Sequence, residues 1–230
     1  MQFLGNFRTL FIHSLKAEWS HAERWLSPLL FATTMLAIFS FAIGDVPEDT
    51  AISIYLAETF LTALFALQLS FSRMLEPDTS DRVFDLLRTY PVSPSAWFLS
   101  KYVLVVIMGL LILLPTMMLS NFFNAELGIP PLSSAMLLIG CLVITSLASL
   151  GVLLSTMMMR SNAKQILYPL LYFPLTTPIL LAAVEASRSL LVNNVTLEAL
   201  FQSWLGLLLV FGVVYFTLGI LLFSELVKPE

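Results

Sequence analysis

Long apolar stretches alternate with short polar segments along nearly the whole chain. A stretch of about 20 apolar residues is long enough to cross the hydrocarbon core of a bilayer as a helix. Six stretches meet this condition, and we expect spans at about 26–43, 51–72, 97–120, 132–158, 165–184 and 203–223. The pattern therefore predicts an all-α, polytopic membrane protein with six transmembrane helices.

The segment before the first span, residues 3–25, has an amphipathic helical pattern. Apolar residues recur at helical spacing from Phe3 to Trp19, and charged residues occupy other positions. A helix of this kind suits the headgroup region, with its apolar face toward the lipid. We therefore expect an N-terminal interfacial helix. The first span should then begin at Ser27 and Pro28, which read as a helix cap followed by proline at the first helical position.

The composition agrees with a membrane protein that has one domain. The 230 residues are 58% hydrophobic and 11% charged, whereas a soluble domain carries about 25% charged residues. No polar stretch is long enough for a second domain, so we assign residues 1–230 to one transmembrane domain.

His13 and His21 have no third metal ligand nearby, and no nucleophile–base pair is evident. We expect no metal site, no catalytic residue and no enzymatic activity, with the lipid bilayer rather than nucleic acid as the surroundings.

The basic residues are distributed very unevenly between the two sets of connecting segments. If both termini lie on one side, that side receives ten of the eleven lysines and arginines, and Arg188 alone falls on the other. Cytoplasmic segments of membrane proteins carry the excess of basic residues. The sequence therefore predicts that both termini, the polar segment 76–101 and the turn at 160–164 are cytoplasmic.

The polar segment 76–101, between the second and third spans, contains a short amphipathic pattern. Asp81 is a competent helix cap, Phe84 and Leu87 contribute to an apolar face, and Pro91 ends the helix. A helix of one to two turns is not stable alone in water, so it must dock on another surface. That surface is either the lipid and the protein's own span ends or a groove in a nucleotide-binding subunit. The residues alone leave both open, although the clustered acids weigh mildly against anionic lipid.

Two motifs resemble the CcmB family, the permeases of the cytochrome c maturation haem exporters, which belong to the ABC-2 type membrane proteins. The first is the family's cytoplasmic motif between its second and third spans, matched by Leu75-x-x-Asp78-x-x-Asp81-Arg82-Val83-Phe84 and followed by Leu87, Pro91, Pro94 and Lys101. The sequence departs from that motif at Leu75, Arg82, Val83 and Phe84. The second is the fifth-span segment from Tyr168 to Leu180.

The resemblance implies a multi-pass permease of the inner (cytoplasmic) membrane that acts in haem export or in ATP-driven release of a haem-loaded chaperone. ATP hydrolysis would be supplied by a separate cytoplasmic ATPase subunit, because the chain has no phosphate-binding loop of its own. A haem-handling membrane subunit and a further small subunit are the other implied partners, with a homodimer or a pseudo-symmetric pair of permeases. Haem would be a substrate, and no cofactor is expected to be covalently bound.

The same resemblance implies that the short cytoplasmic helix couples the permease to its ATPase. The residues expected at this contact are Asp78, Asp81, Arg82, Val83, Phe84, Asp85 and Leu87. Two alternatives remain: an ABC-2 exporter for a lipid, drug or polysaccharide, and a membrane scaffold that transports nothing.

Three polar residues inside the spans are candidates for function. Glu58 is an acid surrounded by apolar residues, and such acids usually face protein or water. The competing interpretation, which we favour, is a hydrated carboxylate near the outer interface. Tyr168 and Tyr172 lie one turn apart and share a face. Tyrosine is a haem ligand in some proteins, but here we favour anchoring at the membrane interface.

Proline and glycine mark the last two spans. Pro169, Pro174 and Pro178 should break the fifth span and free backbone carbonyls, which would line a cavity or be satisfied by neighbouring helices and by nearby threonines. We favour a distorted helix that packs against a partner.

Gly212 and Gly219 lie near one face of the last span and permit close helix approach. That approach is either a contact within the chain or the seam of a dimer.

Overall fold

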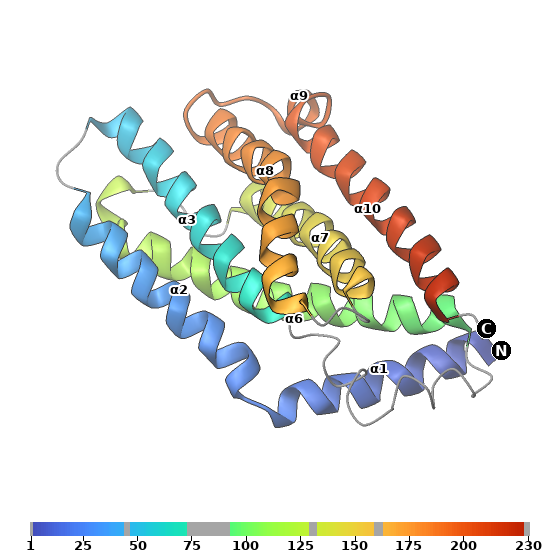
Figure 1. The fold of residues 1–230 in the computed structure, drawn as a ribbon. Helices are drawn as coiled ribbons and strands as arrows, with labels where there is room; N and C mark the ends of the chain where they lie inside the picture. The colour runs from blue at the N-terminus through green and yellow to red at the C-terminus, as the bar shows by residue number, and fades with distance from the viewer. Residues whose placement is uncertain (1, 44–46, 73–92, 129–132, 159–162, 228–230) are drawn as a thin grey trace.

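The computed structural model of the protein describes residues 2–43, 47–72, 93–128, 133–158 and 163–227. Within these ranges every regular element is a helix (Figure 1). In chain order they are α1 (Gln2–Ser20), α2 (Glu23–Ala42), α3 (Glu48–Phe71), α6 (Pro94–Phe123), the short 3-10 helix η2 (Ala125–Leu127), α7 (Ser134–Met157), α8 (Lys164–Leu191), α9 (Leu197–Phe201) and α10 (Trp204–Val227).

Six of these helices, α2, α3, α6, α7, α8 and α10, are long and apolar enough to cross a membrane. This confirms the prediction of an all-α protein with six spans. Two expected helix ends are wrong. The helix α2 begins at Glu23, so Pro28 lies inside it rather than at its first position. The helix α8 continues to Leu191, seven residues past the expected end at 184.

The amphipathic helix expected at the N-terminus is present as α1, which runs across one end of the bundle (Figure 1). Its apolar side chains face two environments. Leu10, Phe11 and Leu15 pack against the buried core of the bundle, whereas Leu4 and Trp19 are exposed. Part of the apolar face that we expected to lie on lipid is therefore covered by protein, and α6 is the helix on which α1 packs.

The helix α7 lies at the centre of the bundle. It is the most buried of the six candidate spans, and α6, α8 and α10 all pack on it.

The packing of α10 shows whether its glycines make a contact within the chain or the seam of a dimer. A Cβ atom on Gly212 would lie 3.0 Å from the Ser146 hydroxyl oxygen, and one on Gly219 would lie 2.9 Å from the Phe98 ring. Both glycines therefore serve close approach within this chain, as in other membrane helix pairs.

The three prolines of α8 do not break it, contrary to expectation. The helix is continuous from Lys164 to Leu191 with all three inside it. The threonine hydroxyls do not satisfy the carbonyls that the prolines free. Thr176 donates to the carbonyls of Tyr172 and Phe173 at 2.9 and 3.0 Å, and Thr177 donates to that of Phe173 at 2.9 Å. The helix α8 packs on α3, α7 and α10, so neighbouring helices of this chain support it on several sides.

Both ends of the described chain lie at the same end of the bundle as α1 (Figure 1). We call this the near end. The helices α3, α7 and α10 finish there, and α6 and α8 start there. At the opposite, far end α2 finishes and α3 starts, and η2 and α9 also lie there.

Candidate functional site

The residues expected at the ATPase contact, from Asp78 to Leu87, lie outside the part of the chain that the structure describes. Their role stays a prediction. The described helices on either side are α3, which ends at the near end, and α6, which starts there (Figure 1). The backbone N–H of Ala96 donates to the hydroxyl of Ser93, which caps α6, and Pro94 occupies its first turn. The third membrane helix therefore begins at Pro94, inside the polar segment 76–101.

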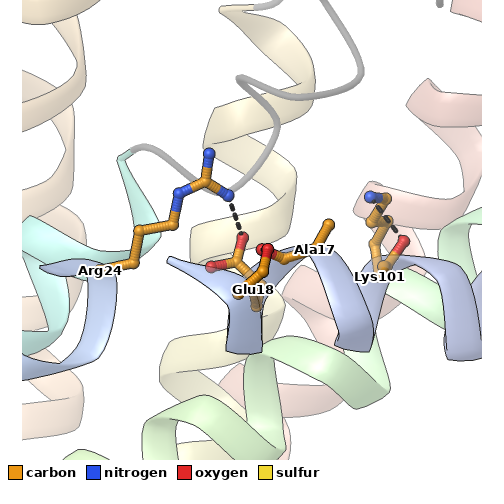
Figure 2. Close-up of polar contacts among 6 residues, drawn as sticks. Ala17, Glu18, Arg24 and Lys101 are labelled. Carbon is orange, nitrogen blue, oxygen red and sulfur yellow. Dashed lines mark hydrogen bonds and ion pairs between the residues drawn. The ribbon is translucent and has the colours of Figure 1, made fainter. Parts of the chain in front are cut away.

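A buried polar junction at the near end joins α1 to α6. The ammonium of Lys101 donates to the Ser14 hydroxyl at 2.9 Å, and both residues are buried (Figure 2). An ammonium removed from water is costly unless it is hydrogen-bonded. In the sequence, Lys101 was counted with the basic residues of the cytoplasmic segments, although it also lies in the span expected at 97–120. One pattern could have predicted that Lys101 is buried: it lies seven residues after Pro94, in a helix whose neighbouring residues are mostly apolar.

The same junction includes an ion pair between α1 and α2. The guanidinium nitrogen Nη1 of Arg24 lies 2.9 Å from Oε1 of Glu18 (Figure 2). The Glu18 side chain is 10% exposed and that of Arg24 is 23% exposed, so water screens the pair less than it would at an open surface. The bond spans the short link between the two helices, and it fixes the angle at which the chain turns from α1 into the bundle.

Glu58 is enclosed by protein near the far end of α3. Only 4% of its surface is exposed, which is less than expected for a hydrated carboxylate at an interface. The Asn124 amide donates to Glu58 Oε1 at 2.7 Å and also to the Ser120 carbonyl at 3.0 Å. Both amide hydrogens of Asn124 are therefore used, and the carboxylate faces a cavity that it helps to line.

The contact between α3 and α6 next to Glu58 is also polar. The hydroxyls of Thr59 and Ser120 are hydrogen-bonded to each other, and both are buried. Tyr55, one turn earlier on α3, is buried as well. Polar side chains from neighbouring turns of α3 therefore gather beside α6, and a polar helix contact of this kind is more specific than an apolar one.

Tyr168 and Tyr172 share a face of α8, and their rings are stacked with centroids 5.6 Å apart. The prediction that they anchor the protein at the membrane interface is wrong, because neither side chain has exposed surface. Instead they fill the interior of the bundle. Neither hydroxyl has a hydrogen-bond partner by geometry among the described residues, and the same is true of Thr62 and Ser187. Haem ligation by these tyrosines stays untested.

His13 lies on α1, and His21 follows the end of that helix at Ser20. His13 and His21 are exposed, and no group of three potential ligands among His, Cys, Asp and Glu occurs in the ranges that the structure describes.

Comparison with known proteins gives one result for the whole chain. The family model of the CcmB protein matches residues 5–227. No individual curated protein matches the chain. The family match extends over all six candidate spans and over α1, and it agrees with the resemblance drawn from the polar segment and the fifth span. The chain therefore belongs to the CcmB family, multi-pass membrane components of the haem-exporting ABC transporter for cytochrome c maturation.

Proposed function

We propose that this chain is the permease that converts ATP hydrolysis by a separate ATPase subunit into haem export or into release of a haem-loaded chaperone. The observation that carries the proposal is the family match over residues 5–227. In this assembly the ATPase is a cytoplasmic subunit, and a haem-handling membrane subunit and a small subunit complete the complex. The permease itself acts as a homodimer or as one of a pseudo-symmetric pair.

The distribution of charge supports an orientation with the near end in the cytoplasm of a bacterial-type inner membrane. Ten basic residues belong in sequence to the near end, and Arg188 belongs to the far end. A cytoplasmic near end brings the segment 78–87 to the side from which an ATPase approaches. A reporter fused after residue 230 should be active only in the cytoplasm, and one inserted at Asn194 only outside it. The reverse result would contradict the orientation.

In the proposed mechanism, the segment 78–87 receives the movement of the ATPase and passes it to α6. Closure of the ATPase would move this segment, and α6, which begins at Pro94 a few residues later in the chain, would carry the movement into the bundle. Exchange between two packed arrangements of the spans is a common form of such transitions. The junction of α6 with α1 supports this path, because a buried ammonium on α6 is bonded to α1.

The coupling role is tested by placing acids on the apolar face of the segment. Substitution of Phe84 and Leu87 by Asp should abolish co-purification of the ATPase subunit, because two carboxylates would be buried in the contact. Thr89→Asp, on the opposite face of the predicted helix, is the matched control and should leave binding unchanged. If the double variant binds and activates the ATPase normally, this segment is not the contact.

The wider function is tested in cells that lack this protein. Covalently attached haem in c-type cytochromes should be lost, and it should return when the gene is supplied again. Normal cytochrome c in the deletion strain would exclude a role in maturation. Sealed vesicles that contain the whole complex then distinguish the two forms of the proposal, because only export predicts that added ATP moves haem across the membrane.

A further inference from the structure

A cavity of about 530 Å³ opens at the far end of the bundle, between α2, α3, α6 and η2. Cavities of this size are typical of sites that hold a ligand or a large side chain. Glu58 and Glu126 contribute carboxylates to its lining, and Phe122 and Phe123 contribute aromatic rings. No lysine, arginine or histidine is among the described residues that line it.

Glu58 is a buried acid that forms no ion pair with any basic residue in the ranges that the structure describes. It is 4% exposed, and among the described residues its hydrogen-bond donor is the Asn124 amide, which binds Oε1. A carboxylate taken out of water loses much of its hydration, and one amide bond replaces only part of it. A positively charged group in the cavity would complete the site by binding the second oxygen.

The aromatic residues suit the apolar part of such a cation. The rings of Phe122 and Phe123 are arranged edge to face with centroids 5.9 Å apart. Phe122 is 75% exposed, so its ring forms part of the rim. Ring faces attract cations, and lysine and arginine place an apolar stem on such surfaces while the charged group reaches further.

The whole far end is acidic, which extends the attraction beyond the cavity. Besides Glu58, which lies inside α3, the connections and adjoining helix turns that belong in sequence to the far end contain Asp45, Glu48, Asp49, Glu126, Glu185 and Glu198 against the single base Arg188. Arg188 is already engaged, with its Nη1 atom 3.8 Å from Glu185 Oε1. A surface with one dominant sign of charge steers oppositely charged macromolecules toward it.

We propose that this cavity receives a lysine or arginine side chain of a partner polypeptide that docks on the far side of the membrane. A phospholipid amine fits less well, because its phosphate would meet Glu126 and no lining base. Anionic ligands are disfavoured for the same reason. The inference goes beyond the proposed function and does not depend on it, since it requires only the cavity, its buried acid and the charge of the far end.

The test measures binding of a fluorescein-labelled hexalysine peptide to the full-length protein in phosphatidylcholine nanodiscs, by fluorescence anisotropy. Phosphatidylcholine is chosen because it lacks a primary amine. Glu58→Gln keeps the shape and removes the charge, and it should weaken binding at least about tenfold, as expected when one member of a buried charge pair is removed. Side-chain-acetylated hexalysine, which is neutral, should not bind.

Glu198→Gln is the matched control, because it removes one acid from the far end outside the cavity. It should weaken binding less than about twofold, the size expected for an exposed charge. Equal losses from Glu58→Gln and Glu198→Gln would overturn the proposal, because binding would then depend on surface charge alone. If Glu58→Gln does not fold, Ala51→Trp takes its place, because Ala51 lines the cavity and the larger side chain would fill it without changing the charge of the far end; this variant should also weaken binding at least about tenfold. Displacement of hexalysine by phosphoethanolamine more readily than by lysine amide would assign the cavity to a lipid headgroup, and this also overturns the proposal.

Discussion

The ammonium of Lys101 on α6 lies 2.9 Å from the hydroxyl of Ser14 on α1, and the two residues are 87 positions apart in the chain. This contact ties the N-terminal helix to the membrane helix that starts within the polar segment 76–101. On α1, Leu10, Phe11 and Leu15 pack against the buried core of the bundle. The helix α1 is therefore held by the protein itself, whether or not its outer face lies on lipid.

Ser14→Ala should loosen α1 from the bundle. The substitution removes an acceptor from a buried ammonium, and hydrogen bonds to charged groups contribute about 1.5–3 kcal/mol. Amide hydrogen exchange in α1 should become faster while α7 remains protected. Ser20→Ala is the control, because the Ser20 hydroxyl is exposed and bonds only to the Ala17 carbonyl of its own helix. Equal exchange in the two variants would show that the bond to Lys101 does not hold α1.

Gly219→Ala should destabilise the contact of α10 with α6. A Cβ atom at this position would lie 2.9 and 3.0 Å from two atoms of the Phe98 ring. That ring is fully buried and packs against Phe216 and Phe223, so it has little room to move. Overpacking of this kind costs about 1–3 kcal/mol, which should appear as a lower midpoint of thermal unfolding in detergent.

Gly5→Ala is the matched control for this substitution. No atom outside the local helix lies within 4 Å of a Cβ at Gly5, which is exposed on α1. Alanine is the better helix former by roughly 0.5–1 kcal/mol, so this variant should be neutral or slightly stabilised. A Gly219→Ala protein as stable as Gly5→Ala would show that α10 does not pack as closely as described.

The number and type of helices could be predicted because the physical signal is strong and local. Long apolar stretches have few alternatives to spanning helices, and the six that we expected are the six that occur. Helix ends were predicted less well. Arg188 and Glu185 read as a polar loop, but they lie three positions apart on α8 and pair across one turn. Pro28 read as a helix start, yet α2 begins at Glu23 before it.

The positions of polar side chains relative to the core could not be predicted from the sequence. A tyrosine suits the interface and the protein interior equally well by composition, and only packing shows that Tyr168 and Tyr172 are inside. Lys101 was counted with the basic residues of the cytoplasmic segments for the same reason, although it is buried in α6. The amide that binds Glu58 belongs to Asn124, which is 66 positions away in the chain, and no local pattern predicts this contact.

Tyr172→Phe should stabilise the protein. Its hydroxyl is buried without a hydrogen-bond partner among the described residues, and an unsatisfied buried polar group costs about 1–3 kcal/mol. Removing the hydroxyl should therefore raise the midpoint of thermal unfolding. The control is Tyr215→Phe, which removes a hydroxyl that donates to the Leu175 carbonyl at 3.1 Å and should be destabilising. If both variants lose stability to the same extent, the Tyr172 hydroxyl is bonded in the folded protein.

A charge exchange tests whether the pair of Glu18 and Arg24 sets the turn between α1 and α2. Glu18→Arg alone places two cations together, and Arg24→Glu alone places two acids together, so each should lower stability. The double variant restores an ion pair with reversed direction and should recover much of the loss. The recovery defines the interaction free energy of the two residues in a double-mutant cycle, which we expect at about 0.5–3 kcal/mol. Because the pair is only partly exposed, the recovery should persist at 0.5 M salt, a concentration that screens surface pairs (about 0.2–1 kcal/mol each). Losses that simply add in the double variant would show that the two side chains do not interact.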